Sequence, residues 1–232
     1  MKTLAAISFV FLMFFVPLSM KATHLMGGNM TYTYVSFNPQ NNTHTYQITL
    51  KIYRYCTGNT ADLDFNTTIG IYAHDPLFPN ANKQLVTTVT APLISQSFIQ
   101  PPSSNPNCSF SANACVEEGI YQANVTVASS LGGYHLTADR CCRNNNIMNL
   151  ANPGAAGQSY HAFIPPTNIV NSSPTFAIAP VPFMCANDTT SILNSAFDPD
   201  GDSLVYTFEI PYNGISGSGN AIPNPPISYP WP

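Results

Sequence analysis

The sequence has little charge. Asp, Glu, Lys and Arg make up 8% of its 232 residues, against about 25% in an ordinary globular protein. Only seven residues are Lys or Arg and the net charge is −4, so the chain lacks the basic stripe that nucleic-acid binding requires. A hydrophobic share of 44% excludes a chain that is disordered by composition. Its solubility must come from uncharged polar side chains.

The sequence also lacks any amphipathic helix. Apolar and polar residues alternate with a period of two, which is typical of half-buried antiparallel strands. The clearest alternation lies at 46–53, 121–127 and 204–210, and further strands are predicted at 28–36, 67–74, 83–91, 133–143 and 159–164. With 21 prolines between these short strands, the sequence predicts an all-β, immunoglobulin-like β-sandwich.

Tyr121 stands at the beginning of one alternating stretch. In immunoglobulin-like sandwiches, a tyrosine at the entry to the penultimate strand turns its hydroxyl back onto the backbone. This position predicts strand F near Tyr121 and strand G from about Tyr134 to Arg143. An ordinary core tyrosine is the alternative.

The N-terminus has the pattern of a secretory signal peptide. A positive Met1-Lys2 start precedes an apolar run from Leu4 to Leu18, and we predict cleavage after Ala22. The run is shorter than the roughly 20 residues that span a bilayer, which argues against an anchor. We expect a secreted chain with no membrane span after signal removal.

Six cysteines follow the signal peptide, and an even count in an exported chain indicates disulfides. The candidates are Cys56, Cys108, Cys115, Cys141, Cys142 and Cys185. Neighbours on a strand face opposite sides, so we do not expect Cys141 and Cys142 to bond each other. We predict a Cys108–Cys115 bridge, with Cys141 and Cys142 bonded to Cys56 and Cys185. Zinc is the alternative, but neither the cysteines nor the five histidines have ligand spacing. These histidines are His24, His44, His74, His135 and His161.

A domain boundary is predicted at Pro165-Pro166. It separates the signal peptide (1–22) and a disulfide-containing sandwich (23–165) from a partial immunoglobulin- or cadherin-like domain (166–232). The last segment has 67 residues, whereas a sandwich domain usually needs about 100. We therefore expect the chain to be the front end of a longer protein.

The most concentrated charge is the DPDGD motif, which contains Asp198, Asp200 and Asp202. One interpretation is a tight turn, because Asp-Pro-x-Gly suits turn positions i to i+3. The other is a Ca²⁺ site, because three carboxylates at alternate positions repel one another without a cation and Ca²⁺ prefers such oxygens. An EF-hand is excluded, since the glycine is misplaced and a strand pattern follows.

Several stretches together resemble a known family. They are THLMGGNMTY, YRYCTGN, CVEEGIYQANVTV, RCCRN, NSSPTF and DPDGDSLVYTFEIPYNG. In this order they are similar to the N-terminal region of large secreted surface proteins of Bacteroidota, which are gliding-motility-associated or sorted by type IX secretion. The resemblance implies PKD- or cadherin-like modules and a cell-surface, outer-membrane-associated location. It also implies calcium ligands shared with a neighbouring module. Relatives carry two further cysteines where this chain has Val170 and Glu209, which implies that the remaining six pair among themselves.

No catalytic constellation is visible in the sequence. Glu117 and Glu118 are neighbours that would point apart on a strand, and we expect them in a loop beside Cys115. Arg140 and Arg143 are expected to pair with Asp139 or Glu117.

The expected function is a non-enzymatic adhesion or spacer module, stiffened by calcium. Its expected partners are downstream modules of the same chain and a surface polysaccharide or protein. The alternative is an accessory carbohydrate-binding domain of a secreted hydrolase, whose aromatic platform would use Tyr53, Tyr55, Tyr72 and Trp231.

Overall fold

Strands make up just over half of the residues that the computed structural model describes. It describes residues 25–57, 61–78, 83–99, 115–150, 152–178, 183–184, 189, 191–214 and 223–225. The predicted signal peptide, Cys108, Cys185 and Trp231 lie outside the described residues.

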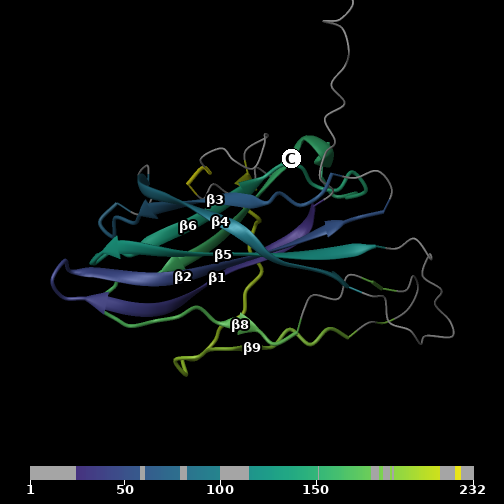
Figure 1. Ribbon diagram of the computed structural model, residues 1–232. Helices are drawn as coiled ribbons and strands as arrows, with labels where there is room; N and C mark the ends of the chain where they lie inside the picture. The colour runs from purple at the N-terminus through teal and green to yellow at the C-terminus, as the bar shows by residue number, and fades with distance from the viewer. Residues whose placement is uncertain are drawn as a thin grey trace, which may run out of the picture.

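Seven long strands and four short elements follow one another along the chain (Figure 1). The long strands are β1 (Leu25–Asn38), β2 (Thr43–Tyr55), β3 (Asn66–Ala73), β4 (Gln84–Ile99), β5 (Val116–Ala128), β6 (Tyr134–Arg140) and β7 (Gly157–Ile164). The short elements are a 3-10 turn (Pro153–Ala155) and the two-residue strands β8 (Thr175–Phe176), β9 (Ala196–Phe197) and β10 (Asn213–Gly214). The strands predicted within 28–164 are confirmed, with bounds that differ by a few residues, the largest difference being at the end of β4.

One curled antiparallel sheet with the order β1-β2-β5-β4-β3-β6-β7-β10 forms both layers of the sandwich. The layer β1-β2-β5-β4 packs over β3-β6-β7 (Figure 1). Strand β4 belongs to both layers: it pairs with β3 as far as Pro92 and with β5 from Leu93. A register shift after Leu93 marks this corner, as in sandwiches whose strands switch sheets at a bulge. The order matches the A-B-E-D and C-F-G layers of a constant-type immunoglobulin fold, which confirms the predicted fold class.

The core lies between the layers and consists of the inward residues of the alternating strands. Its most deeply buried members include Tyr46, Ile48, Leu50, Ile69, Ile71, Tyr121 and Leu136. The layers also meet where β1 approaches β7: Tyr160 Oη donates a hydrogen bond to the Gly27 carbonyl oxygen (3.4 Å). A side chain at Gly28 would overlap the Tyr160 ring and the Lys51 carbonyl oxygen, so this approach requires glycine.

The tyrosine corner exists, but at a different tyrosine. Tyr134 begins β6, the F-equivalent strand, and its hydroxyl donates to the Ala128 carbonyl oxygen across the β5–β6 connection (2.8 Å). The prediction that strand F begins near Tyr121 is wrong. Tyr121 lies in β5, and its hydroxyl bonds the carbonyl oxygen of Asp64, 57 residues upstream. A tyrosine at the start of an alternating stretch does not by itself identify strand F, because Tyr121 has this position in β5, the E-equivalent strand.

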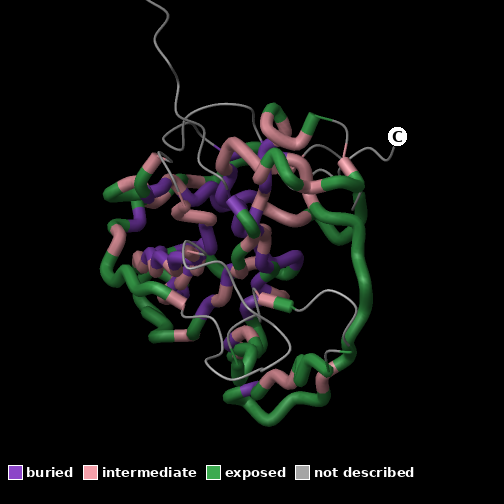
Figure 2. The backbone as a smooth tube through the Cα atoms, turned by 90° about the vertical axis from the view of Figure 1, so that its right-hand side faces the viewer, coloured by how far each residue is buried: buried purple, intermediate pink, exposed green. Residues whose placement is uncertain are grey.

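The predicted strand at 204–210 does not form. The segment pairs with no neighbour in the described structure, and Val205 and Phe208 are exposed. Figure 2 shows a long exposed segment, in green, along one side of the molecule, whereas the buried positions, in purple, lie toward its middle. Of the described residues beyond 166, only β8 and β9 pair with each other, and β10 extends the first sheet. A second sandwich domain therefore stays a prediction.

The predicted disulfide pairing is wrong. Cys56, after β2, bonds Cys115, before β5. Cys141 and Cys142 bond each other across a cis peptide. Strand neighbours point apart and cannot bond each other, but this rule does not apply to Cys141 and Cys142, because β6 ends at Arg140.

Candidate functional site

The DPDGD motif forms a tight turn. The Gly201 N–H donates to the Asp198 carbonyl oxygen (3.3 Å), and Gly201 has a positive φ of 81°. The buried Asp198 carboxylate accepts the backbone N–H groups of Asp200 (2.9 Å) and Asp202 (3.3 Å). The turn interpretation is therefore confirmed, with the side chain of Asp198 satisfying the backbone of its own motif.

The same turn binds the NSSP motif. The Ser172 N–H donates to Asp200 Oδ2 (2.6 Å), and Asn171 Nδ2 donates to Asp202 Oδ2 (3.3 Å). We call residues 171–173 and 198–202 the aspartate clasp. Two motifs that lie 25 residues apart in the sequence thus form one structural unit.

The aspartate clasp is fixed to the free edge of β1. The outward N–H groups of Tyr32 and Tyr34 donate to the hydroxyls of Ser173 (2.8 Å) and Ser172 (3.1 Å). The Ser173 N–H donates to the Tyr32 carbonyl oxygen (2.9 Å), and Tyr32 Oη donates to Asn171 Oδ1 (2.5 Å). An exposed strand edge with unpaired N–H groups can pair with other strands. Here the serine hydroxyls accept hydrogen bonds from two of these N–H groups.

The residues of the aspartate clasp do not fit a calcium site as they stand. One oxygen of each carboxylate accepts a bond from a protein N–H group, whereas Ca²⁺ needs six to eight converging oxygens. Among the described residues, no three His, Cys, Asp or Glu side chains are arranged to hold a metal ion. Calcium stays a prediction that this geometry does not support.

A charged network lies inside the first sandwich. Glu117 lies in β5 rather than in a loop, is 1% exposed, and pairs with Arg54 of the adjacent β2. Gln96 also donates to Glu117. Arg140 pairs with Asp64, and Arg143 donates to the Gly157 carbonyl oxygen (3.0 Å). Arg140 therefore pairs with a carboxylate other than the two expected, whereas the expected ion pair of Arg143 stays a prediction. The Arg54–Glu117 pair joins two neighbouring strands. The order of residues along the chain does not reveal such a contact.

Three histidines form a row that sequence spacing did not reveal. His74 Nδ1 lies 3.1 Å from His135 Nε2, and His135 Nδ1 lies 2.9 Å from His161 Nε2. They come from the end of β3, from β6 and from β7, and are brought together diagonally by strand pairing. Tyr212 packs edge-on against His161. The row uses both nitrogens of His135, so its lone pairs do not converge on one point, as a metal would require.

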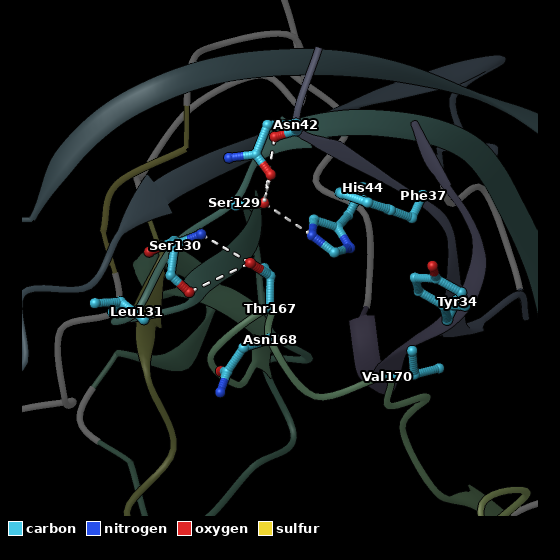
Figure 3. Close-up of a pocket in the computed structure, with 10 residues that line it drawn as sticks. All are labelled: Tyr34, Phe37, Asn42, His44, Ser129, Ser130, Leu131, Thr167, Asn168 and Val170. Carbon is cyan, nitrogen blue, oxygen red and sulfur yellow. Dashed lines mark hydrogen bonds between the residues drawn. The ribbon is translucent and has the colours of Figure 1, made fainter. Parts of the chain in front are cut away.

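A pocket of about 480 Å³ opens at the end of the sandwich where the β1–β2 turn, the β5–β6 connection and the chain after β7 meet (Figure 3). Its residues are Tyr34, Phe37, Asn42, His44, Ser129, Ser130, Leu131, Thr167, Asn168 and Val170. Thr167 fixes one wall, because its hydroxyl accepts the Ser130 N–H (2.7 Å) and its own N–H bonds the Ser130 carbonyl oxygen (2.9 Å). The pocket is thus built by hydrogen bonds between distant segments.

A serine and a histidine lie side by side in this pocket. Ser129 Oγ is 3.0 Å from His44 Nε2 and donates to Asn42 Oδ1 (2.7 Å). Since an amide oxygen only accepts, the serine proton is directed at Asn42, and His44 Nε2 must be the donor to Ser129. A catalytic base needs the opposite arrangement. No hydrogen-bond partner orients His44 Nδ1 in the described structure, and burial lowers the pKa of His44. The pair therefore fixes the turn at Asn42 and is not arranged as a nucleophile and base.

The three described tyrosines of the proposed aromatic platform are not exposed, and Trp231 lies outside the described residues. Tyr53 and Tyr72 are buried and Tyr55 is half-buried, and the Tyr72 hydroxyl donates to the Pro223 carbonyl oxygen. Alternation alone did not distinguish a tyrosine covered by a later segment from one that faces solvent. Of the exposed aromatic rings in the described structure, Phe37 lies in the pocket, whereas others, such as Phe98 and Phe208, lie outside it.

Comparisons with family models, curated proteins and solved structures gave no match. The resemblance to Bacteroidota surface proteins therefore stays a sequence-based expectation. In the described part of the chain, no helix is long and apolar enough to cross a membrane.

Proposed function

We propose that this chain is a non-enzymatic module of an exported bacterial surface protein, acting in adhesion or as a spacer. The observation that carries the proposal is the aspartate clasp. A spacer must transmit force and orientation from one module to the next, and a free linker cannot do so. In this chain, hydrogen bonds hold residues 171–173 and 198–202 against β1.

The bonding inside the sandwich supports the same role. The Cys56–Cys115 disulfide and the buried Arg54–Glu117 pair join β2 to β5 at the same end of the two strands. Disulfides are the usual reinforcement of exported domains. In this proposal the clasp supplies the stiffness at the joint that calcium was expected to supply.

Single-molecule pulling on the full chain tests the proposal. We expect the clasp to resist force and residues 171–202 to be released with the sandwich or shortly before it. Release of these 32 residues adds about 110 Å of extended chain. The Ser172→Ala/Ser173→Ala variant should release the same length at a much lower force. The matched Ser36→Ala/Ser97→Ala variant alters exposed serines in β1 and β4 and should behave as the wild type.

Two results would overturn the proposal. One is release of 171–202 at negligible force in the wild-type chain. The other is turnover of an ester, glycoside or peptide substrate that Ser129→Ala abolishes. A calcium titration of the same chain measures whether the ion adds to the release force.

A further inference from the structure

The pocket at the end of the sandwich has the dimensions of a small-molecule site. Its volume of about 480 Å³ lies within the roughly 300–1,000 Å³ range of ligand pockets. Its walls come from three segments held together by the Ser129–Asn42 and Thr167–Ser130 bonds. A ligand would therefore enter a largely preformed site and would order little of the protein on binding.

The pocket is uncharged, which restricts the ligand. None of its ten described lining residues is Asp, Glu, Lys or Arg. Its one basic group is His44, which is 7% exposed and whose pKa is lowered by burial, so the ring is neutral. Burying a charged ligand without a partner is costly, so phosphates, carboxylates and metal ions do not fit this site.

Apolar and polar side chains are only partly segregated in the pocket, because Leu131 lies beside Ser130 and Thr167 (Figure 3). Phe37, Tyr34 and Val170 lie on one side, and Phe37 is 44% exposed. Ser129, Thr167 and Asn168 lie on the other. A ligand that complements both sides must have an apolar face and polar groups at its edge.

Two amides remain for hydrogen bonding to a ligand. The Oδ1 of Asn42 accepts the Ser129 hydroxyl, which leaves the NH₂ group of Asn42 as a donor. Asn168 is exposed at the rim and offers both a donor and an acceptor. Such a small number of neutral polar groups around an aromatic surface fixes the orientation of a neutral, hydroxyl-bearing ligand.

We propose that this pocket binds a neutral sugar residue of an extracellular glycan. The C–H face of a pyranose ring packs on Phe37 and Tyr34 by dispersion, and its hydroxyls bond Asn42 and Asn168. A neutral polyol meets all three restrictions: no charge, one apolar face, and hydroxyls at the edge. An aromatic peptide side chain meets only the first two. The inference deepens the adhesion role proposed above and names its ligand class.

Ligand-observed and ¹⁵N NMR titrations of the full chain test the proposal. The probes are glucose, galactose, mannose, N-acetylglucosamine and their short oligomers, with glucuronate as the charged comparison. We expect at least one neutral sugar to saturate with millimolar affinity and to shift the amides of Phe37, Asn42 and Asn168. Glucuronate should bind more weakly than its neutral counterpart.

Pocket variants then locate the site. Phe37→Ala should weaken binding at least tenfold and Asn168→Ala several-fold. The matched variant Phe98→Ala removes an exposed aromatic from β4, outside the pocket, and should leave affinity unchanged. The circular dichroism spectrum and unfolding midpoint of each variant show whether it is folded.

Three outcomes would overturn the proposal. They are no saturable binding of any neutral sugar, equal weakening by Phe98→Ala, and binding of phenylalaninamide at the pocket in the absence of sugar binding. None of these outcomes affects the release force of the clasp. The sugar proposal and the spacer proposal can therefore fail separately.

Discussion

The first sandwich and the segment that follows it contain the same sequence pattern with opposite outcomes. Residues 121–127 and 204–210 both alternate apolar and polar side chains. The first stretch lies in β5 and pairs along its length with β2, and Val125 and Val127 are buried. The second has no partner strand in the described structure, and Val205 and Phe208 are exposed. Alternation shows that a segment can serve as a strand, whereas cross-strand neighbours decide whether it does.

The difference also concerns how each region is held in place. The sandwich has continuous ladders, a buried ion pair and two disulfides among its described residues. The following segment is held by the hydrogen bonds of the clasp, by the two residue pairs of β10 with β7, and by single hydrogen bonds of Tyr212, Pro223 and Asn224 to the sandwich. Substitutions in the sandwich should therefore cost more free energy of unfolding than substitutions in the later segment.

The largest effect is expected from the Cys56–Cys115 disulfide. Its cysteines are 59 residues apart, and closing such a loop in the unfolded chain is worth about 4 kcal/mol on the chain-entropy model. The Cys56→Ser/Cys115→Ser variant should lose about this much stability in urea unfolding. The wild-type chain in reductant is the matched comparison, and an unchanged unfolding midpoint in both samples would show that the bridge does not brace the sandwich.

Arg54→Met should have the next largest effect, because it leaves Glu117 buried without its ion-pair partner. Breaking a buried pair from one side costs about 3–5 kcal/mol, and we expect about 3 because Gln96 still donates to Glu117. Asp62 contacts the same arginine but is 90% exposed. Asp62→Asn should therefore not change the urea midpoint measurably. Equal losses in the two variants would contradict the importance of burial.

Acidification should destabilise the sandwich through the histidine row. Burial, together with His161 and Lys83, lowers the pKa of His135 to about 3, and burial and Lys83 lower that of His161 to about 4. Free histidine titrates near pH 6.5, so between about pH 6.5 and pH 4 the unfolded chain binds more protons than the folded chain. This contribution to stability is complete above about pH 6.5 and is lost as the pH falls.

Urea unfolding at a series of pH values measures this loss. We expect about 2 kcal/mol between about pH 7 and pH 4, with allowance for solvent screening of the half-buried rings. In the His135→Gln/His161→Gln variant, the free energy of unfolding should lose about 2 kcal/mol less over this pH range. The loss caused by protonation of carboxylates at lower pH should remain. If the free energy of unfolding depends on pH identically in wild type and variant, the folded state does not disfavour protonation of these histidines.

The smallest effect is expected in the unpaired segment. Phe208→Ser should change the free energy of unfolding by less than about 0.5 kcal/mol, as at other exposed positions. Val125→Ser, at the equivalent kind of position in β5, should cost about 2 kcal/mol or more, because it leaves a cavity and a buried hydroxyl. A large loss for Phe208→Ser would show that residues 204–210 pair with a part of the chain outside the described residues.

Much of the candidate site could not be predicted from the sequence. The turn at Asp198–Gly201 follows from local chemistry, and it is one of the two interpretations that the sequence left open. The contact of Asp200 with Ser172, and the pocket formed by His44, Ser129 and Thr167, join residues far apart in the chain. The disulfide partner of Cys115 could not be predicted for the same reason. Cys56 becomes its neighbour only through the pairing of β2 with β5.

The sequence by itself determined the all-β class, the approximate positions of the strands in the first sandwich and the aspartate turn, because backbone alternation and turn chemistry act over a few residues. Only the tertiary structure decided which tyrosine forms the corner, which charges are buried together, which histidines touch and where a pocket opens. Those features depend on which strand lies beside which, and strand neighbours are chosen by the packing of the whole sheet.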